Sequence, residues 1–281
     1  MASTAGSTGS TASSLFTPST TWNELGVRAE AWGAERTLRW AETSFSPRLT
    51  LATGFGAEGC VIIDLVARMG LAVDIFTLDT GVLFPETYDL WKRLEERYGI
   101  TIKGVRPAQT LEEQAATYGD KLWERQPEKC CALRKVAPLG PALKGYDAWV
   151  TAIRRDQTAN RASALPIEWD AKNGLVKVNP LVRWSKDAVW AYIREWDVPY
   201  NALHDKGYPS ISCRTCTSPV KNGEDDRAGR WRGNEKTECG LHVIPLTPAA
   251  EAPVPVAAPV AAAPVAAIPA APVPAATETR A

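Results

Sequence analysis

Four of the six cysteines in this sequence are arranged as two closely spaced pairs. Cys130 and Cys131 are adjacent, whereas Cys213 and Cys216 are separated by two residues. Four thiolates are a typical ligand set for a tetrahedral zinc ion or an iron–sulfur cluster. A zinc ribbon prefers two spaced pairs, while adjacent thiolates can reach two irons of one cubane, so the spacing favours a [4Fe–4S] cluster over zinc. A structural disulfide and unrelated buried thiols are the alternatives.

The other two cysteines differ in their surroundings. Cys60 lies between Gly59 and Val61 in a stretch expected to be helical, and we expect it to be a packing thiol. Cys239 lies near the end of the expected folded region, three residues before His242. A nearby imidazolium favours the thiolate, which is the nucleophilic form of cysteine. The pattern indicates a nucleophile, Cys239, assisted by His242, with an incidental surface cysteine as the alternative.

Basic residues near these cysteines could bind an anion. Lys135 follows the adjacent cysteine pair by one helical turn, and Arg227 and Arg230 precede Cys239. Arg155 follows a predicted strand, so its side chain could also face a ligand cleft. Guanidinium groups bind sulfate and phosphate oxygens through paired hydrogen bonds. Each residue alone could be an ordinary surface cation, but together they indicate a dianionic nucleotide ligand.

Two glycine-containing turns each follow a predicted strand. In the first, Thr53-Gly54-Phe55-Gly56, we expect Thr53 and Gly56 to help hold an anionic group at the start of the next helix. In the second, Leu78-Asp79-Thr80-Gly81, Asp79 could accept hydrogen bonds from an adenine or a ribose. The alternatives are an ordinary strand-to-helix turn for the first and a turn cap for the second.

Short apolar runs alternate with helical patterns through the part of the chain that would position these residues. The predicted strands are residues 49–52, 73–78, 100–105 and 148–153. The predicted helices are residues 23–45, one after Gly56, one from Pro85 to Gly99 and one that starts near Ser185. This alternation predicts right-handed βαβ units and an α/β fold with a mainly parallel sheet flanked by helices. Ligands of such sheets bind beyond the carboxyl ends of the strands, where both turns are expected.

Composition sets the expected domain limits and excludes some functions. The chain has 281 residues with 32 basic and 32 acidic side chains, so its net charge of zero argues against nucleic-acid binding. Residues 1–21 are rich in Ser and Thr, and residues 247–281 are rich in Ala, Pro and Val. We expect both segments to be disordered, because they lack the large apolar side chains that build a core, and the folded domain to span residues 22–246. Recurrent prolines argue against a membrane span in the tail, and we expect no secretory leader.

Taken together, these motifs resemble those of assimilatory adenylyl-sulfate (APS) reductases of the iron–sulfur type, within the PAPS reductase family. The resemblance extends over about residues 22–243. The residues that carry it are Cys130-Cys131 with Arg134-Lys135, Cys213 and Cys216, Arg154-Arg155-Asp156-Gln157, Leu78-Asp79-Thr80-Gly81 and Glu238-Cys239-Gly240-Leu241-His242. It implies an adenine-nucleotide hydrolase-like fold, which agrees with the alternation of strands and helices.

The resemblance also implies a reaction. Cys239 would attack the sulfur of APS, release AMP and become an S-sulfocysteine, from which thioredoxin or a glutaredoxin-like donor would release sulfite. It implies a [4Fe–4S] cluster on Cys130, Cys131, Cys213 and Cys216, and a cytoplasmic enzyme of sulfate assimilation without nucleic-acid or membrane partners.

Three other functions are considered. The nearest is a 3′-phospho-APS (PAPS) reductase with the same chemistry, although the four paired cysteines favour APS. An ATP pyrophosphatase of sulfur transfer would need a Ser-Gly-Gly-x-Asp-Ser type of loop, which this chain lacks. A non-enzymatic zinc module would contain zinc in place of iron and sulfide.

Overall fold

The computed structural model describes residues 18–242, which form a six-stranded sheet in the order β3-β2-β1-β4-β6-β5. Strands β1, β2, β3, β4 and β6 are parallel, and β5 is antiparallel to β6. The strands are β1 (Leu49–Thr53), β2 (Asp74–Leu78), β3 (Ile102–Val105), β4 (Ala148–Val150), β5 (Ile167–Asp170) and β6 (Leu175–Val178). The predicted α/β class with a mainly parallel sheet is confirmed.

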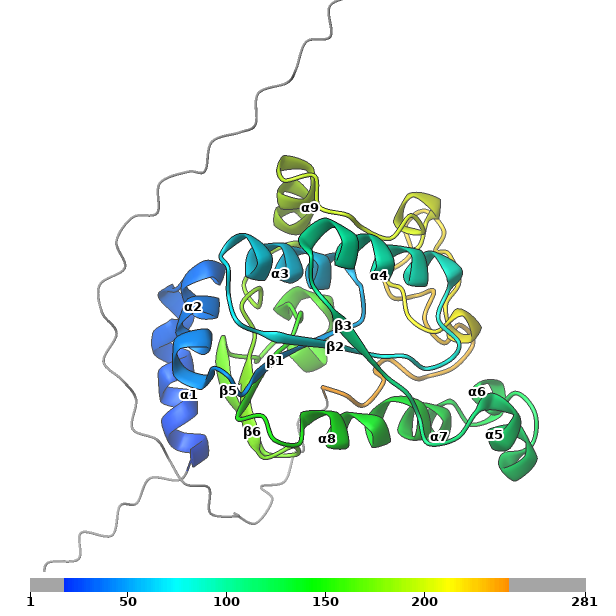
Figure 1. Cartoon of the computed structure of the whole chain (residues 1–281). Coiled ribbons are helices and arrows are strands. Elements are labelled where there is room, and N and C mark those ends of the chain that lie inside the picture. Colours follow the sequence, from blue (N-terminus) through cyan, green and yellow to red (C-terminus); the bar gives the residue numbers. More distant parts are fainter. Residues whose placement is uncertain (1–17, 243–281) are drawn as a thin grey trace, which may run out of the picture.

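Helices cover both faces of this sheet. Figure 1 shows α3 and α4 along one face and α8 along the opposite face, with α1 and α2 at the end of the sheet that β5 closes. The helices are α1 (Pro18–Arg28), α2 (Ala34–Phe45), α3 (Ala57–Arg68), α4 (Pro85–Tyr98), α5 (Leu111–Tyr118), α6 (Leu122–Arg125), α7 (Pro127–Cys131), α8 (Ala137–Leu143) and α9 (Lys186–Glu195). Among the described helices, none has the length and apolar character needed to cross a bilayer.

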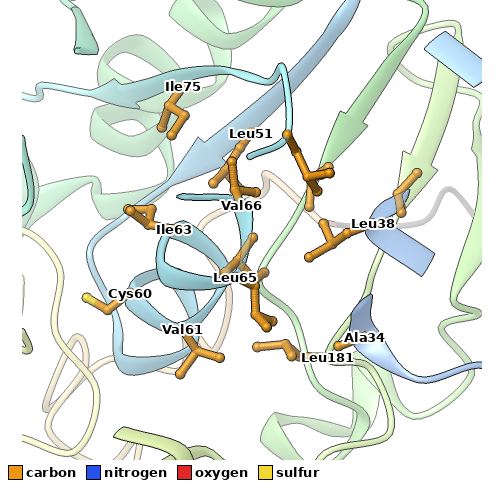
Figure 2. Packing of buried hydrophobic residues seen from close by; sticks show 14 of the residues in the cluster. Ala34, Leu38, Leu51, Cys60, Val61, Ile63, Leu65, Val66, Ile75 and Leu181 are labelled. Carbon is orange, nitrogen blue, oxygen red and sulfur yellow. The ribbon is translucent and has the colours of Figure 1, made fainter. Parts of the chain in front are cut away.

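The main core lies between the sheet and α3. In Figure 2, Leu51 of β1 and Ile75 of β2 face apolar side chains of α3, among them Ile63 and Val66. Strand residues alternate between faces, and a smaller cluster around Phe76 and Trp149 packs against α8 on the other side. Because both faces are covered, the central strands are buried along most of their length.

Cys60 lies in the main core, as predicted for a packing thiol. Its side chain is fully buried on α3 (Figure 2). Burial raises the pKa of this thiol to about 12, so it stays protonated at neutral pH. Cys60 is therefore a poor nucleophile.

Three elements differ from the sequence prediction. The predicted helix over residues 23–45 is two helices, because the chain is extended at Gly33 and α2 starts anew there. The predicted strand over residues 148–153 ends at Val150. The β5–β6 hairpin was not predicted, although Asn173-Gly174 is a hairpin signal and Gly174 has the positive φ of 70° that such a turn uses.

The predicted terminal segments are largely outside the described part of the chain. Helix α1 begins at Pro18, within the segment predicted as residues 1–21. The remainder of that segment and the whole predicted tail, residues 247–281, fall within residues 1–17 and 243–281, which are not described.

Candidate active site

A cleft of about 320 Å³ lies at the carboxyl ends of β1, β2 and β4. The cleft is lined by the turn after β1, the ends of β2 and β4, and residues 209–212. Residues from the segment 225–242 line one further side of it. The strand order changes direction at β1, because β2 and β3 lie on one side of β1 and β4 lies on the other side. This position is where open α/β sheets bind ligands, and the size suits a small molecule such as a nucleotide.

The turn after β1 lines the cleft as predicted. Thr53 and Gly56 both contact it, and Gly56 is the residue that precedes α3. Phe55 has a positive φ of 58°, and its buried ring stacks on Trp91. The Thr53 hydroxyl accepts a hydrogen bond from the Phe55 N–H at 3.1 Å, which fixes the turn. The first turn of α3 therefore faces the cleft.

Asp79, in contrast, is not among the residues that line the cleft. Its carboxylate accepts hydrogen bonds from the Tyr88 hydroxyl at 2.6 Å, Arg106 Nε at 3.1 Å and the Gly81 N–H at 3.1 Å. Burial works to raise the pKa of Asp79, but these donors outweigh it and the net pKa is lowered. The neighbouring Thr80 lines the cleft, and its Oγ1 lies 3.3 Å from the Cys213 thiol. Thr80 was not predicted.

The two consecutive arginines after β4 also point in different directions. Arg155, the predicted site residue, donates to the Ala164 carbonyl at 2.7 Å and to Glu30, away from the cleft. Arg154 lines the cleft and is buried, where it pairs with Glu58 and with Asp156 at 2.9 Å.

The four paired cysteines lie in the neighbourhood of Lys135, a residue of the cleft wall. Cys130 and Cys131 lie on α7, and Cys213 and Cys216 flank a short helical turn. Burial, followed by the neighbouring thiols of Cys213 and Cys216, raises the pKa of Cys130 to about 11, so the two pairs interact. Burial also raises the pKa of Cys131 to about 11. Among residues 18–242, however, no three Cys, His, Asp or Glu side chains are grouped closely enough to hold a metal ion as they stand.

The chemistry of this set nevertheless fits an iron–sulfur cluster better than a mononuclear centre. All four ligand candidates are thiols, and three of them are buried. Two adjacent cysteines bind two irons of one cluster more easily than they bind a single metal ion, and Cys130 and Cys131 are adjacent. Burial works to raise the pKa of Cys213, but Lys135, the hydrogen bond between Cys213 and Thr80, and Arg230 outweigh it, so the net pKa is lowered.

Lys135 links the cysteine pairs to the cleft. It lies in a π-helical turn, Ala132–Val136, and its Nζ donates to Ser212 Oγ at 2.6 Å. Burial works to lower the pKa of Lys135, but the thiols of Cys213 and Cys239 outweigh it, so the pKa is raised. A charged ammonium group is therefore maintained between the paired cysteines and Cys239. π-Helical turns within α-helices frequently occur at functional sites.

Cys239 is half-buried and lines the cleft. Its segment folds back over the cleft with a positive φ of 83° at Gly240, whose carbonyl accepts a hydrogen bond from Lys172 at 2.9 Å. The Cys239 thiol interacts electrostatically with both Lys135 and Arg230. Lys135 and Arg230 therefore lie near enough to Cys239 to act on charge that develops there.

Arg227 and Arg230 both line the cleft, as predicted, but they have different partners. Arg227 donates to the Thr237 carbonyl at 2.8 Å and lies 3.4 Å from the Glu238 carboxylate. Arg230 donates to Ser210 Oγ at 3.2 Å, and its buried Nε has no hydrogen-bond partner. Arg230 therefore keeps a free donor.

His242 lies in the cleft wall, where its ring stacks on Trp149 with centroids 5.7 Å apart. Burial, then the positive charges of Lys177, Arg161 and other neighbouring basic residues, lowers the pKa of His242 well below its ordinary value. The ring is thus neutral at neutral pH, whereas the sequence prediction assigned an imidazolium there. Lys135 and Arg230 supply the positive charge instead.

A family model described as "Phosphoadenosine phosphosulfate reductase domain" matches residues 48–219. The chain belongs to this family. It is 47% identical over 221 residues to the "Adenosine 5'-phosphosulfate reductase" of Halalkalibacterium halodurans, which covers 78% of this chain and 96% of that protein. It is 49% identical over 211 residues to "Adenosine 5'-phosphosulfate reductase 1" of Bacillus subtilis, with 75% and 91% covered.

A solved structure of the PAPS reductase family has a similar fold. It is a crystal structure of phosphoadenylyl-sulfate (PAPS) reductase from Candida auris in a phosphate complex, with a TM-score of 0.64 and 34% identity. The alignment covers 74% of this chain and all of that one. The predicted resemblance to the PAPS reductase family is thereby confirmed, and the chain is an oxidoreductase of sulfur groups.

Proposed function

We propose that this protein reduces adenylyl sulfate to sulfite and AMP through an S-sulfocysteine on Cys239, with thioredoxin or a glutaredoxin-like protein as the reductant. The observation that carries the proposal is the position of the half-buried Cys239 thiol, in the wall of a nucleotide-sized cleft beside Lys135 and Arg230. APS is the preferred substrate because the curated relatives with 47% and 49% identity are named adenosine 5'-phosphosulfate reductases.

In the first step, the Cys239 thiolate attacks the sulfur of APS. A sulfur–sulfur bond forms, and the bond between the sulfonyl sulfur and the AMP phosphate oxygen breaks, with its electron pair leaving on AMP. Lys135 and Arg230 line the same cleft as the thiol, so they can offset the charge of the transferring sulfonate. Thr53 and Gly56, at the start of α3, are our candidates for contacts with the nucleotide.

In the second step, a thiolate of the reductant attacks Cys239 Sγ. Sulfite leaves with the bonding electrons, and a mixed disulfide forms between the two proteins. The second thiol of the reductant then releases Cys239, so two electrons pass from the dithiol to the sulfonate sulfur. This exchange needs access to Cys239, which is only half-buried.

Cys130, Cys131, Cys213 and Cys216 are our candidates to hold a [4Fe–4S] cluster. When bound, such a cluster would tie α7 to the turn at Arg214–Cys216 and add to the local charge near Lys135. Cys239 is not part of this set. We also propose a cytoplasmic location, which the six free cysteines support, because reducing compartments preserve thiols.

A second candidate substrate is PAPS. The similar solved structure is a PAPS reductase, and the chemistry at Cys239 would be unchanged. The substrate test is anaerobic incubation of the holoprotein with reduced thioredoxin and either APS or PAPS, followed by sulfite assay. We expect APS to have the higher kcat/KM. Faster turnover of PAPS would favour the second candidate, and no sulfite from either would contradict the proposal.

A further inference from the structure

The carboxylate of Glu238, the residue before the candidate nucleophile, is held by side chains from other segments. Arg161 donates to both of its oxygens, from Nε to Oε1 at 3.1 Å and from a terminal nitrogen to Oε2 at 3.0 Å. Thr158 Oγ1 donates to Oε1 at 3.0 Å, and a terminal nitrogen of Arg227 lies 3.4 Å from Oε2. A carboxylate held by a two-pronged guanidinium is among the strongest polar contacts in proteins.

This ion pair is also buried. The side chains of Arg161 and Glu238 are 10% and 8% exposed. Loss of one partner of a buried pair leaves the charge of the other partner uncompensated. Removal of either Arg161 or Glu238 should therefore destabilise the contact strongly. Two other polar contacts join residues 237–242 to the body, from Arg227 to the Thr237 carbonyl and from Lys172 to the Gly240 carbonyl, and both are exposed and weaker. Glu238 is therefore the main polar attachment of the Cys239 segment.

The pairing also divides the cations of the cleft into two groups. Arg161 and Arg227 already share the carboxylate of Glu238. Lys135 and Arg230 have no carboxylate partner within residues 18–242. Their hydrogen bonds go to the hydroxyls of Ser212 and Ser210, and the Arg230 guanidinium also lies over the Trp231 ring, 4.4 Å from its centroid. A dianion that binds in the cleft therefore does not compete with a protein carboxylate for Lys135 and Arg230.

We propose that Glu238 is a positioning residue that holds Cys239 over the cleft through Arg161 and Arg227. The role of Cys239 as the nucleophile rests on the proposed function, whereas the docking of the segment does not. In this arrangement Arg227 acts on the segment that carries Cys239.

The test uses the full-length holoprotein with Glu238→Gln. Two measurements need no substrate: hydrogen exchange of residues 237–242, and iodoacetamide alkylation of Cys239 followed by peptide mass spectrometry over several pH values. We expect both to be about 10-fold faster than in the wild type, because the buried pair is lost. The third measurement is transfer to Cys239 from APS without reductant, which we expect to slow by about 10-fold or more while the Kd for AMP changes by less than about 2-fold.

Further variants separate docking from a general disturbance. Arg161→Gln removes the other partner of the same ion pair. The rates of exchange, alkylation and transfer in the double variant should differ from wild type by no more than in either single variant. Glu238→Asp keeps the charge with a shorter reach, so we expect an intermediate effect. Glu224→Gln is the matched control, because Arg232 also holds Glu224 with two bonds, at 3.0 and 2.8 Å, but this pair is exposed and neither residue lines the cleft. It should leave all three measurements unchanged.

Two results would overturn the proposal. Unchanged exchange and alkylation in Glu238→Gln and Arg161→Gln would show that the segment is held by other contacts. AMP binding that becomes several-fold tighter in Glu238→Gln would show that Glu238 instead occupies the anion site of the nucleotide. If the variants release the segment but the wild type forms no adduct from APS, the docking is correct and the proposed function is wrong.

Discussion

At the scale of single residues, the partners of each cation decide what it can do in the cleft. Arg230 contacts a serine hydroxyl and keeps a buried Nε without a hydrogen-bond partner. Burial lowers the pKa of Arg230, while the nearby thiol of Cys239 opposes that change. A fixed anion beside Arg230 would therefore stabilise its buried positive charge. A buried donor that lacks a partner is stabilised when a ligand supplies one.

Arg230→Gln should therefore weaken the chemical step more than nucleotide binding. We expect transfer to Cys239 to slow by about 100-fold, because one preorganised donor to the developing charge is lost. The Kd for AMP should change by less than about 3-fold, since AMP lacks the sulfonate. Rapid-quench measurement of AMP release and equilibrium dialysis test the two effects. Arg155→Gln is the control, and it should change neither. Equal losses in both assays for Arg230→Gln would assign Arg230 to general nucleotide binding.

Sequence patterns located the cysteines and the turns of the site but not the direction of every side chain. The paired cysteines and Thr53 follow from local spacing; Cys130 and Cys131 lie on α7, and Thr53 lines the cleft. Asp79 and Arg155 have suitable positions, but their directions are set by partners that are distant in sequence, Arg106 and Glu30. No local signal reports such partners. Arg161 was missed for the same reason, because its role depends on contact with Glu238.

At the scale of elements, one close backbone contact fixes α1 against the sheet. A Cβ added at Gly26 would lie 2.0 Å from the Ile167 carbonyl oxygen of β5, a distance that no rotation of a side chain can relieve. Helix α1 can therefore approach the outer strand only because position 26 has no side chain. This contact could not be predicted from the local pattern, because β5 itself was not predicted.

Gly26→Ala should separate α1 from β5. We expect the free energy of unfolding to fall by about 2 kcal/mol or more, because backbone atoms must move to make room. Urea denaturation measures the change. Gly33→Ala is a matched control near the start of α2, where the nearest atom to an added Cβ is a Glu35 oxygen at 3.6 Å, and it should cost less than about 1 kcal/mol. Equal stability of the two variants would show that α1 does not depend on this contact.

At the scale of the whole molecule, buried histidines make stability depend on pH. His204 lies between Trp190 and Tyr200, with ring centroids 5.1 and 6.4 Å away. Burial lowers the pKa of His204 from its ordinary 6.5 to about 4. Between these two values the unfolded chain binds a proton that the folded chain does not, so the free energy of unfolding falls as pH falls from 6.5 to about 4. Above 6.5 this contribution is fully present.

His204→Phe should reduce that dependence. The aromatic contacts remain while the titrating group is removed, so the loss of stability between pH 6.5 and 4.5 should shrink by about 1–3 kcal/mol relative to wild type. Urea denaturation of both proteins at the two pH values measures the difference, and the slope that remains includes His242. An unchanged slope in the variant would show that His204 is not the group responsible.

The identity of the nucleophile tests the whole account most directly. Holoprotein incubated anaerobically with APS and no reductant should release one AMP per site and gain about 80 Da, one SO₃ group, on Cys239, because the second step cannot proceed. Cys239→Ser should bind AMP and keep its iron yet form no adduct. An adduct on Cys60 or on one of the paired cysteines, or sulfite production by Cys239→Ser at the normal rate when thioredoxin is added, would contradict the account.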